Sequence, residues 1–450
     1  MNKDNAKSVE SFAKDPIPKV VITNSIPALI AMVMVMVYNF ADVFFIGLTG
    51  DDFQVAAVSL ASPVFMIFMS LGTLFGVGGS SVISRALGAG QTDLAKKASS
   101  FCFWASTAVG IVFTVLIWAT LGRLTIMLGA SENTMDFART YQLITVGCGT
   151  FSMISNCLSN VIRTEGEPMK AMTGTLIGNL VNIILDPIMI LALGWGIKGA
   201  AIATVIGNVA GAGYYLLYFF RGKTALSIRV KDFSMKNRIF IDVVSIGISA
   251  SLVNILSSVT AIIANGQLAK YSDMFVAGYG VTSKVLMIIT LFGIGVGSGV
   301  QPIMGYCYGS GNKKRLVETI KFSSLFATVL CLVAAVICFI FAGPITNIFL
   351  TDITAYDKGI EFTRILMTTA WLIGGFAICQ NSLQAMGAAI PALLASVIRQ
   401  GVILIPAMFI LQSIMGANGL LWAQPVTDVL SLVVVAIMMA VKIKKSPGLK

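Results

Sequence analysis

The stretch "VAAVSLASPVFMIFMSLGTLFGVG" at residues 55–78 returns 221 positions later as "VAGYGVTSKVLMIITLFGIGVGSG" at residues 276–299. Two further pairs share this offset: "GAGQ" at 88–91 with "GSGN" at 309–312, and "RTEGEPMKA" at 163–171 with "QAMGAAIPA" at 384–392. One offset that holds over more than a hundred residues indicates that the chain consists of two homologous halves.

The composition indicates a membrane protein. Of 450 residues, 56% are hydrophobic and 11% are charged, and the mean hydropathy is +0.88, whereas a soluble domain has about 25% charged residues. A membrane-spanning helix needs about 20 mostly apolar residues. We predict twelve such spans, at residues 20–48, 54–82, 99–122, 139–161, 171–194, 199–220, 239–265, 275–303, 321–343, 362–383, 391–413 and 417–441.

Six spans in each half predict an all-α integral membrane fold, with twelve transmembrane helices in two six-helix lobes. Because six is an even number, the two halves are parallel repeats, related by a pseudo-twofold axis along the membrane normal. The expected organisation is a cytoplasmic N-terminal segment (1–19), an N-lobe (20–220), a cytoplasmic linker (221–238), a C-lobe (239–441) and a cytoplasmic tail (442–450).

The basic residues predict the orientation, since cytoplasmic loops retain Lys and Arg. With the N-terminus inside, most of the 31 Lys and Arg residues fall in cytoplasmic segments, and both termini are expected in the cytoplasm. The net charge of +11 then reflects topology and contact with anionic lipid. It does not indicate a nucleic-acid partner.

The residue types present argue against an enzyme. The chain has no His, and its seven Cys residues form no CxxC pair. This removes the common zinc and haem sites and the nucleophiles that depend on His. The sequence also contains no Walker motif. We therefore expect no catalytic residues and no cofactor other than a coupling ion.

Two aspartates lie deep within predicted spans of the first half. Asp42 occurs in "VYNFADVFFIG" (37–47) and Asp186 in "NIILDPIMI" (182–190). At 1.5 Å per residue, they lie about 13 Å and about 18 Å from the outer ends of their spans. A carboxylate at the centre of a membrane helix costs roughly 2.5–3.5 kcal/mol or more to insert. No Lys or Arg falls in the membrane region of the same lobe.

Polar residues accompany these aspartates at helical spacing, so that each set shares a helix face. They are Tyr38 and Asn39 on the first span, Asn156 and Asn160 on the fourth, Asn179 and Asn182 on the fifth, and Thr204 and Asn208 on the sixth. A single buried Asn or Thr commonly just fixes helix register. Two carboxylates at matching depth without a basic partner instead hold a proton or recruit a small cation. We interpret Asp42 and Asp186 as ion-coupling groups for H+ or Na+.

The second half lacks this pair, since the offset of 221 places Ile263 and Ala407 at the equivalent positions. Its spans contain Lys284, Arg399 and Asp428 instead. The favoured interpretation is a structural ion pair that involves Asp428, and the alternative is contact with a substrate.

With these motifs the chain resembles the multidrug and toxic compound extrusion (MATE) family, and within it the prokaryotic branch of DNA-damage-inducible and staphylococcal exporters. The resemblance covers essentially the whole chain. Its marks are "VYNFADVFFIG", "RTEGEPMKA", "NIILDPIMI" and, after the eighth span, "QPIMGYCYGSGNKKR" at 301–315. It implies alternating-access antiport of cationic or amphiphilic organic compounds against H+ or Na+, by a multi-pass protein of the bacterial cytoplasmic membrane.

The resemblance also implies a set of coupling residues. They are Tyr38, Asp42, Tyr141, Asn160, Asn182, Asp186 and Thr204, with a possible Na+ site at Asp42, Asn182, Asp186 and Thr204. The expected partners are small organic cations, lipophilic drugs and membrane lipid, and the chain is expected to act as a monomer. A lipid-linked oligosaccharide flippase is the alternative function, and a channel or membrane enzyme is a third.

Overall fold

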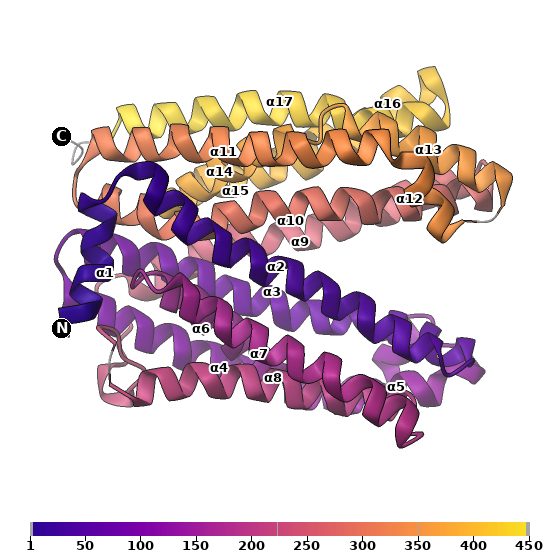
Figure 1. Ribbon diagram of the computed structural model, residues 1–450, viewed down its shortest axis with the longest axis horizontal. Coiled ribbons are helices and arrows are strands. Elements are labelled where there is room, and N and C mark those ends of the chain that lie inside the picture. The colour runs from indigo at the N-terminus through magenta and orange to yellow at the C-terminus, as the bar shows by residue number, and fades with distance from the viewer. Residues whose placement is uncertain (1–2, 223, 351, 447–450) are drawn as a thin grey trace. The chain divides into compact units, whose positions relative to one another are not determined.

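The computed structural model describes residues 3–222, 224–350 and 352–446, in which every regular element is a helix (Figure 1). In chain order the elements are α1 (Lys3–Lys14), α2 (Ile17–Gly47), α3 (Asp52–Gly88), α4 (Thr92–Met127), α5 (Glu132–Gly147), α6 (Gly149–Arg163), α7 (Pro168–Asp186), η1 (Pro187–Ala192), α8 (Ile197–Phe220), η2 (Val230–Asp232), α9 (Ile239–Ala269), α10 (Asp273–Gly309), α11 (Lys313–Ile340), α12 (Ala342–Phe349), α13 (Ile353–Met367), α14 (Leu372–Ala385), α15 (Ala389–Val397), η3 (Ile398–Leu404), α16 (Ile405–Met415) and α17 (Ala417–Lys444). All twelve predicted spans fall on these helices.

Two of the predicted spans are broken. Among the described residues, ten helices are long and apolar enough to cross a membrane, and α13 with α14 forms an eleventh span that bends by 51°. The predicted fourth span, 139–161, is divided in the same way, because α5 ends at Gly147 and α6 begins at Gly149. The break at Cys148 lies 221 residues before Thr369, which falls in the break between α13 and α14. Both halves therefore interrupt the helix of their fourth span at the same place.

The repeat extends to local structure. Helices α3 and α10 each contain 37 residues and begin 221 positions apart. Asp51 caps the first by accepting the Phe53 N–H at 3.0 Å, and Ser272 caps the second by accepting the Met274 N–H at 3.2 Å. Beyond the other ends of these helices, the glycines of "GAGQ" and "GSGN" at positions 90 and 311 have φ of 74° and 73°, a conformation that favours glycine.

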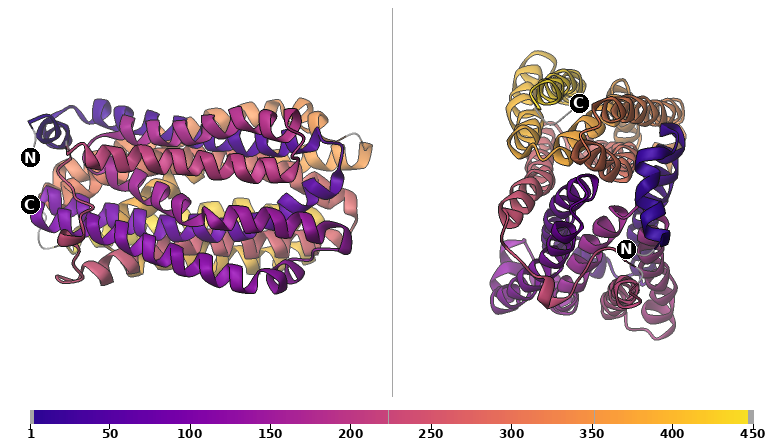
Figure 2. Two further views of the ribbon diagram at one scale, coloured as in Figure 1. Left: turned by 90° about the horizontal axis from the view of Figure 1, so that it is seen from below. Right: turned by 90° about the vertical axis from the view of Figure 1, so that its left-hand side faces the viewer.

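The contacts divide the chain into two units. Unit 1 contains Ile30–Gly247 and the segment before Asp15, and unit 2 contains Asp15–Leu29 and the chain from Ile248 onward. In unit 1, α3, α4 and α6 pack against one another, and in unit 2, α10, α11 and α14 do the same. Figure 2 shows the long helices of each unit running side by side. The first turns of α2 thus belong to unit 2, and the first turns of α9 belong to unit 1.

Glycines make these exchanged contacts close. A Cβ atom on Gly78 of α3 would collide with the backbone of Val243, at the start of α9. A Cβ atom on Gly299 of α10 would meet the backbone of Asn24 and Ser25, at the start of α2, at 2.6 to 3.0 Å. Small residues allow such close packing of membrane helices.

The segment 221–238 is fixed to unit 1 by a buried carboxylate. Glu165, in the turn between α6 and α7, is 0% exposed. Its Oε1 atom accepts hydrogen bonds from the Thr224 hydroxyl (2.7 Å) and from the N–H groups of Ala225 (2.6 Å) and Leu226 (3.1 Å), and its Oε2 atom accepts one from the Tyr218 hydroxyl (2.9 Å). Burial raises the pKa of Glu165, because desolvation disfavours the charged form.

Helix α4 fixes the next residues of the same segment. Ser99 donates to the Ser227 carbonyl at 2.8 Å and accepts its N–H at 3.1 Å. The Trp104 indole N–H donates to the Ile228 carbonyl at 3.0 Å, and Ser100 donates to the carbonyl of residue 229 at 2.8 Å. The predicted linker is therefore a folded part of unit 1, held through its backbone.

We predict that Glu165→Ala destabilises unit 1 by on the order of 3 kcal/mol, because several buried donors lose their acceptor. Glu165→Gln should be mild, since the amide oxygen still accepts and no charge is buried. Thermal unfolding in detergent and tryptic cleavage at Lys231 measure the effect. Glu10→Ala is the control, because Glu10 is an exposed carboxylate of the same unit, 3.1 Å from the Lys14 ammonium.

The raised pKa of Glu165 also predicts a pH dependence. The stability that protonated Glu165 contributes is fully present below the pKa that this residue has in the unfolded chain. It is lost as the pH rises through the higher pKa that Glu165 has in the folded protein. The initial rate of tryptic cleavage in the linker is therefore compared between the native protein and Glu165→Gln, which cannot titrate at this position. As the pH falls, the native protein should become more resistant to cleavage relative to the variant. Equal pH profiles for the two proteins would contradict this account.

Candidate functional site

Asp42 and Asp186 are both buried in unit 1, as carboxylates without a basic partner. Asp42 is 6% exposed and Asp186 is 0% exposed. Within the described part of the chain, neither forms an ion pair. The Oδ1 atom of each also has no hydrogen-bond partner there. Since buried polar atoms are almost always satisfied, these two oxygens are the acceptors that a proton or cation would fill.

Helices α7 and α8 meet beside Asp186 through Asn182 and Thr204. Asn182 lies one turn before Asp186 on α7, and Thr204 of α8 contacts Asn182. We assign the Asn182 amide by its hydrogen bonds, because only one orientation satisfies both neighbours. Its nitrogen then donates to Asp186 Oδ2 at 3.1 Å, and its oxygen accepts the Thr204 N–H at 3.1 Å. Asn182 therefore connects the two helices at the level of the carboxylate.

Two tyrosines complete the cluster. The Tyr141 hydroxyl, on α5, approaches the Asp42 carboxylate closely enough to interact with it. Tyr38, one turn before Asp42 on α2, interacts with the Thr204 hydroxyl, as Tyr141 also does. Six of the seven predicted residues thus lie together, on four different helices of one unit. They supply carboxylate, amide and hydroxyl oxygens, the ligand types that hard cations prefer.

The local backbone at this cluster is irregular. Asp186 is the last residue of α7, and the π-helical stretch η1 begins at Pro187. Proline has no N–H to donate to the carbonyl of the preceding turn, so the α-helical hydrogen-bond ladder cannot continue regularly through it. Short π-helical stretches inside helices occur frequently at functional sites. The motif "LDPI" therefore changes the helix from α to π geometry directly after Asp186.

The contacts of Asn160 differ from those of the other six predicted site residues. Its Nδ2 atom donates to the Asn156 carbonyl at 2.9 Å and lies beside Gly76 of α3. In unit 2, Asn381 donates to the Ala377 carbonyl at 2.8 Å and lies beside Gly297 in the same way. A contact repeated in the half that lacks the aspartate pair is a packing contact between helices. A role for Asn160 in cation coupling stays a prediction.

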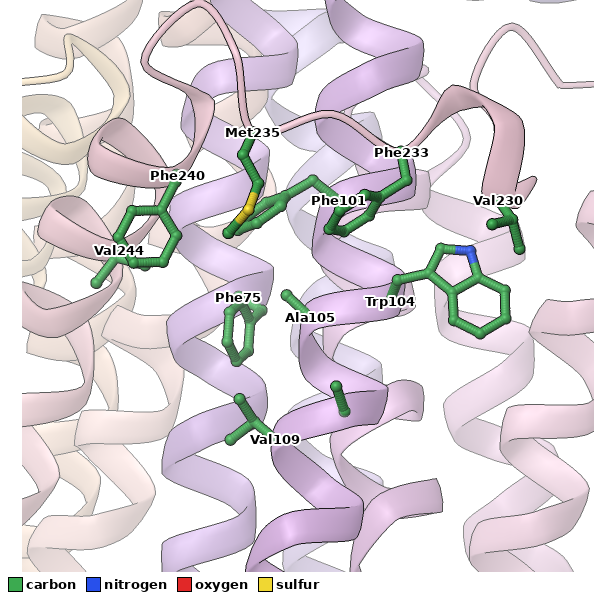
Figure 3. A pocket seen from close by; sticks show the side chains of 11 residues that line it. Phe75, Phe101, Trp104, Ala105, Val109, Val230, Phe233, Met235, Phe240 and Val244 are labelled. Atoms are coloured by element: carbon green, nitrogen blue, oxygen red, sulfur yellow. The ribbon is translucent and has the colours of Figure 1, made fainter.

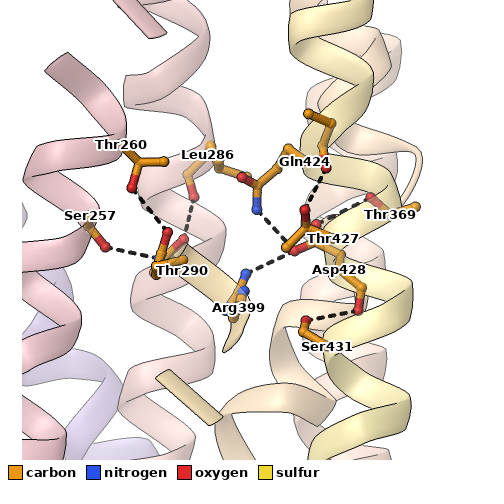
Figure 4. Close-up of polar contacts among 12 residues, drawn as sticks. Ser257, Thr260, Leu286, Thr290, Thr369, Arg399, Gln424, Thr427, Asp428 and Ser431 are labelled. Atoms are coloured by element: carbon orange, nitrogen blue, oxygen red, sulfur yellow. Dashed lines mark hydrogen bonds and ion pairs between the residues drawn. The ribbon is translucent and has the colours of Figure 1, made fainter. Parts of the chain in front are cut away.

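Unit 2 contains the one buried ion pair among the described residues (Figure 4). Arg399, on η3, donates from Nη2 to Asp428 Oδ1 at 2.9 Å, and both side chains are nearly enclosed, at 13% and 1% exposure. Gln424 donates to Oδ1 at 3.0 Å, and Thr369 donates to Oδ2 at 3.3 Å. The guanidinium group also stacks 4.3 Å from the ring centroid of Phe376. Asp428 is thus fully partnered, unlike the aspartates of unit 1.

Lys284, the other cation predicted within these spans, has a separate position. Its ammonium lies 5.2 Å from the ring centroid of Phe349 and forms no ion pair in the described part of the chain. The sequence left the partner of Asp428 open, and the structure assigns Arg399. Gln424 could have been found from its position four residues before Asp428, on the same helix face. Thr369 and Phe376 come from another helix and carry no such local signal.

An all-helical membrane chain with two homologous halves, one of which buries unpartnered carboxylates, has the architecture of a secondary transporter. The MatE family model matches residues 27–188 and residues 249–410, which together make up most of the chain. This protein belongs to the MatE family. The two matches begin 222 residues apart, within one residue of the offset found between the halves.

Its relatives cover the full architecture. The chain is 31% identical to the multidrug export protein MepA of Staphylococcus aureus strain MRSA252, over 92% of this chain and 91% of MepA. It is 29% identical to MepA of Staphylococcus saprophyticus over the same shares. The expected branch of staphylococcal exporters is therefore represented among these relatives, and the DNA-damage-inducible assignment stays a prediction.

Solved structures confirm the predicted fold class of two lobes. An outward-facing multidrug resistance MATE family transporter superposes with a TM-score of 0.92 and 24% identity, covering 97% of this chain and 98% of that one. A variant of the Vibrio cholerae MATE transporter VcmN gives a TM-score of 0.90 and 20% identity, with 98% and 99% covered.

We predict that Asp428→Asn acts mainly on stability. Removal of one partner of a buried ion pair leaves the other charge uncompensated and costs about 3–5 kcal/mol. The double variant Asp428→Leu, Arg399→Met removes both charges and should recover much of the thermal stability in detergent. Dye efflux per folded molecule should fall less in Asp428→Asn than in variants of Asp42 or Asp186. A stable Asp428→Asn protein that fails to transport one class of compound would instead identify a substrate contact.

Proposed function

We propose that this protein exports cationic or amphiphilic organic compounds across the bacterial cytoplasmic membrane, in exchange for H+ or Na+. Membership of the MatE family and similarity to the multidrug export protein MepA over nearly the whole chain support the export of drug-like compounds. The observation that carries the antiport mechanism is the pair of buried carboxylates, Asp42 and Asp186, each with an unpartnered oxygen. We further propose that the protein acts as a monomer with both termini in the cytoplasm.

The proposed cycle couples the charge of this pair to helix position. Without a cation, the two carboxylates repel each other in a medium of low dielectric constant. A bound proton or sodium ion removes the repulsion, so that α2 and α7 can approach each other or bend at Pro187. The change disfavours a bound lipophilic cation and releases it outside. Substrate binding has the opposite effect and expels the coupling ion.

A lipid-linked oligosaccharide flippase is less well supported. A pyrophosphate group needs free basic side chains within the membrane. The two predicted for the C-lobe are Arg399, which is paired with Asp428, and Lys284, which stacks on an aromatic ring. The relatives named above are multidrug exporters, which also favours the export of organic compounds.

We predict that Asp42→Asn and Asp186→Asn each abolish coupled efflux and leave expression and membrane insertion intact. The amide keeps the shape of the carboxylate and cannot exchange a cation. Dye efflux from inverted vesicles, driven separately by a pH gradient and by a sodium gradient, measures the loss and distinguishes the two ions. Glu132→Gln, at an exposed carboxylate of the same unit, is the control and should transport normally. Near-normal efflux by both aspartate variants would remove the coupling site from unit 1.

We predict that substrate and coupling ion weaken each other's binding by the same factor, as thermodynamic linkage requires. Affinity for a fluorescent cationic dye should fall by about tenfold or more when the coupling ion is added. Equilibrium titrations across mildly acidic to mildly alkaline pH, with and without sodium, measure this. The effect should disappear in the Asp42→Asn, Asp186→Asn double variant. Dye affinity that is indifferent to both ions in the native protein would rule out antiport.

A further inference from the structure

A pocket of about 490 Å³ lies in unit 1, where the segment 221–238 crosses α4 (Figure 3). Its inner wall is formed by Phe75 of α3 and by Phe101, Trp104 and Ala105 of α4. The Trp104 N–H already donates to the Ile228 carbonyl, so the indole presents its apolar face. Every residue of the lining is hydrophobic. The volume is in the range of pockets that hold small ligands.

The outer wall comes from the linker and the start of α9. Val230, Phe233 and Met235 project from the linker, and Phe240 of α9 lies near Met235 (Figure 3). These four side chains remain 40% to 67% exposed. Clustered exposed hydrophobic residues commonly mark a binding site. Here the pocket has an apolar entrance as well as an apolar interior.

The wall is preformed. Its backbone is held by Ser99, Ser100 and Trp104 of α4, as described above. Between the linker and α9, Asn237 and Arg238 have φ of 55° and 61°, the left-handed region that side chains other than glycine rarely adopt. These two residues form a tight turn between the end of the linker and the first residue of α9. The linker residues that form the outer wall therefore already have a fixed backbone conformation before any ligand binds.

The entrance is also positively charged. In the linker sequence "RVKDFSMK" (229–236), Arg229 and Lys231 flank the lining residue Val230, and Lys236 follows the lining residue Met235. All three basic side chains are exposed and form no ion pair among the described residues. Asp232, the nearby acid, accepts a 2.5 Å hydrogen bond from the Ser227 hydroxyl. The apolar side chains of this segment thus line the pocket, and exposed basic residues without an ion pair lie next to them in the sequence, on a segment predicted to lie on the cytoplasmic face.

We propose that this pocket binds one acyl chain of an anionic phospholipid of the cytoplasmic leaflet, whose phosphate is held by Arg229, Lys231 and Lys236. The apolar interior suits a hydrocarbon chain, and the cations at its entrance suit a phosphate. Basic residues near a membrane surface attract anionic lipid by about 1 kcal/mol each. The site is distinct from the Asp42 and Asp186 cluster and does not depend on the efflux mechanism.

Native mass spectrometry of the purified full-length protein, equilibrated with vesicles of equal parts phosphatidylglycerol and phosphatidylcholine, tests the proposal. The native protein should retain phosphatidylglycerol over phosphatidylcholine by at least about fivefold, the equivalent of one cation–headgroup contact. The variant Arg229→Gln, Lys231→Gln, Lys236→Gln should lose this preference. The control Lys314→Gln, Lys321→Gln, Lys444→Gln removes the same charge from exposed positions of unit 2 and should keep it. Equal retention of the two lipids by the native protein, or a preference that survives the first variant, would overturn the proposal.

A second variant tests the pocket itself. Ala105→Phe fills the interior and leaves the three cations in place, so it should also lose the preference for phosphatidylglycerol. Glycerol phosphate, which has the headgroup chemistry without an acyl chain, should not displace the retained lipid. A preference that persists in Ala105→Phe, or displacement by glycerol phosphate, would show that the cations alone attract phosphate and that no acyl chain enters the pocket.

Discussion

A carboxylate in the interior of a membrane protein must be neutralised, because hydrocarbon cannot hydrate it and an unpaired charge there is costly. This chain meets the requirement in two ways. Asp428 is neutralised permanently, by an arginine at 2.9 Å and two further donors. Asp42 and Asp186 have no such partner, and each keeps an open oxygen. Only the second arrangement leaves room for an ion that comes and goes, so the difference between the lobes separates a structural charge from an exchangeable one.

The homologous halves share their scaffold and differ in their charges. Helix caps, turn glycines, the broken fourth span and the asparagine–glycine contact between helices all recur near the offset of 221. Both halves need these features, which satisfy the backbone groups at helix ends and allow helices to pack closely. The aspartate pair and the arginine ion pair do not recur. Features that repeat therefore belong to the fold. The aspartate pair occurs once and has no basic partner, which makes it, and not the repeated Asn160 contact, the stronger candidate for function.

The sequence predicts much of this fold because hydrophobic runs mark the membrane spans locally and because the two halves can be aligned directly at an offset of 221 residues. Helical spacing predicts which side chains share a face of one helix, as Asn182 and Asp186 do. That the faces of four helices meet at one site, and that Tyr141 belongs to it, is implied only by the resemblance to the MATE family. The sequence does not predict the partner of Asp428, because Arg399 and Lys284 are equivalent by composition and only tertiary packing distinguishes them. Glu165 is missed for the same reason. The four groups that donate hydrogen bonds to Glu165 belong to residues more than fifty positions away, and two of them are backbone N–H groups.

The packing of α9 changes the role of the segment between the halves. The sequence suggests that residues 221–238 connect two lobes, yet Glu165 and α4 hold this segment on unit 1, and α9 remains in unit 1 as far as Gly247. The chain therefore passes between the units three times: between α1 and α2 after Lys14, and within two continuous helices, α2 after Leu29 and α9 after Gly247. Pro27 removes a backbone hydrogen bond beside the crossing within α2, and glycine lowers helix stability at the crossing within α9. Both helices are therefore weakened beside the residues where they pass from one unit to the other, and Asp42 lies on the same continuous helix as the first of these points.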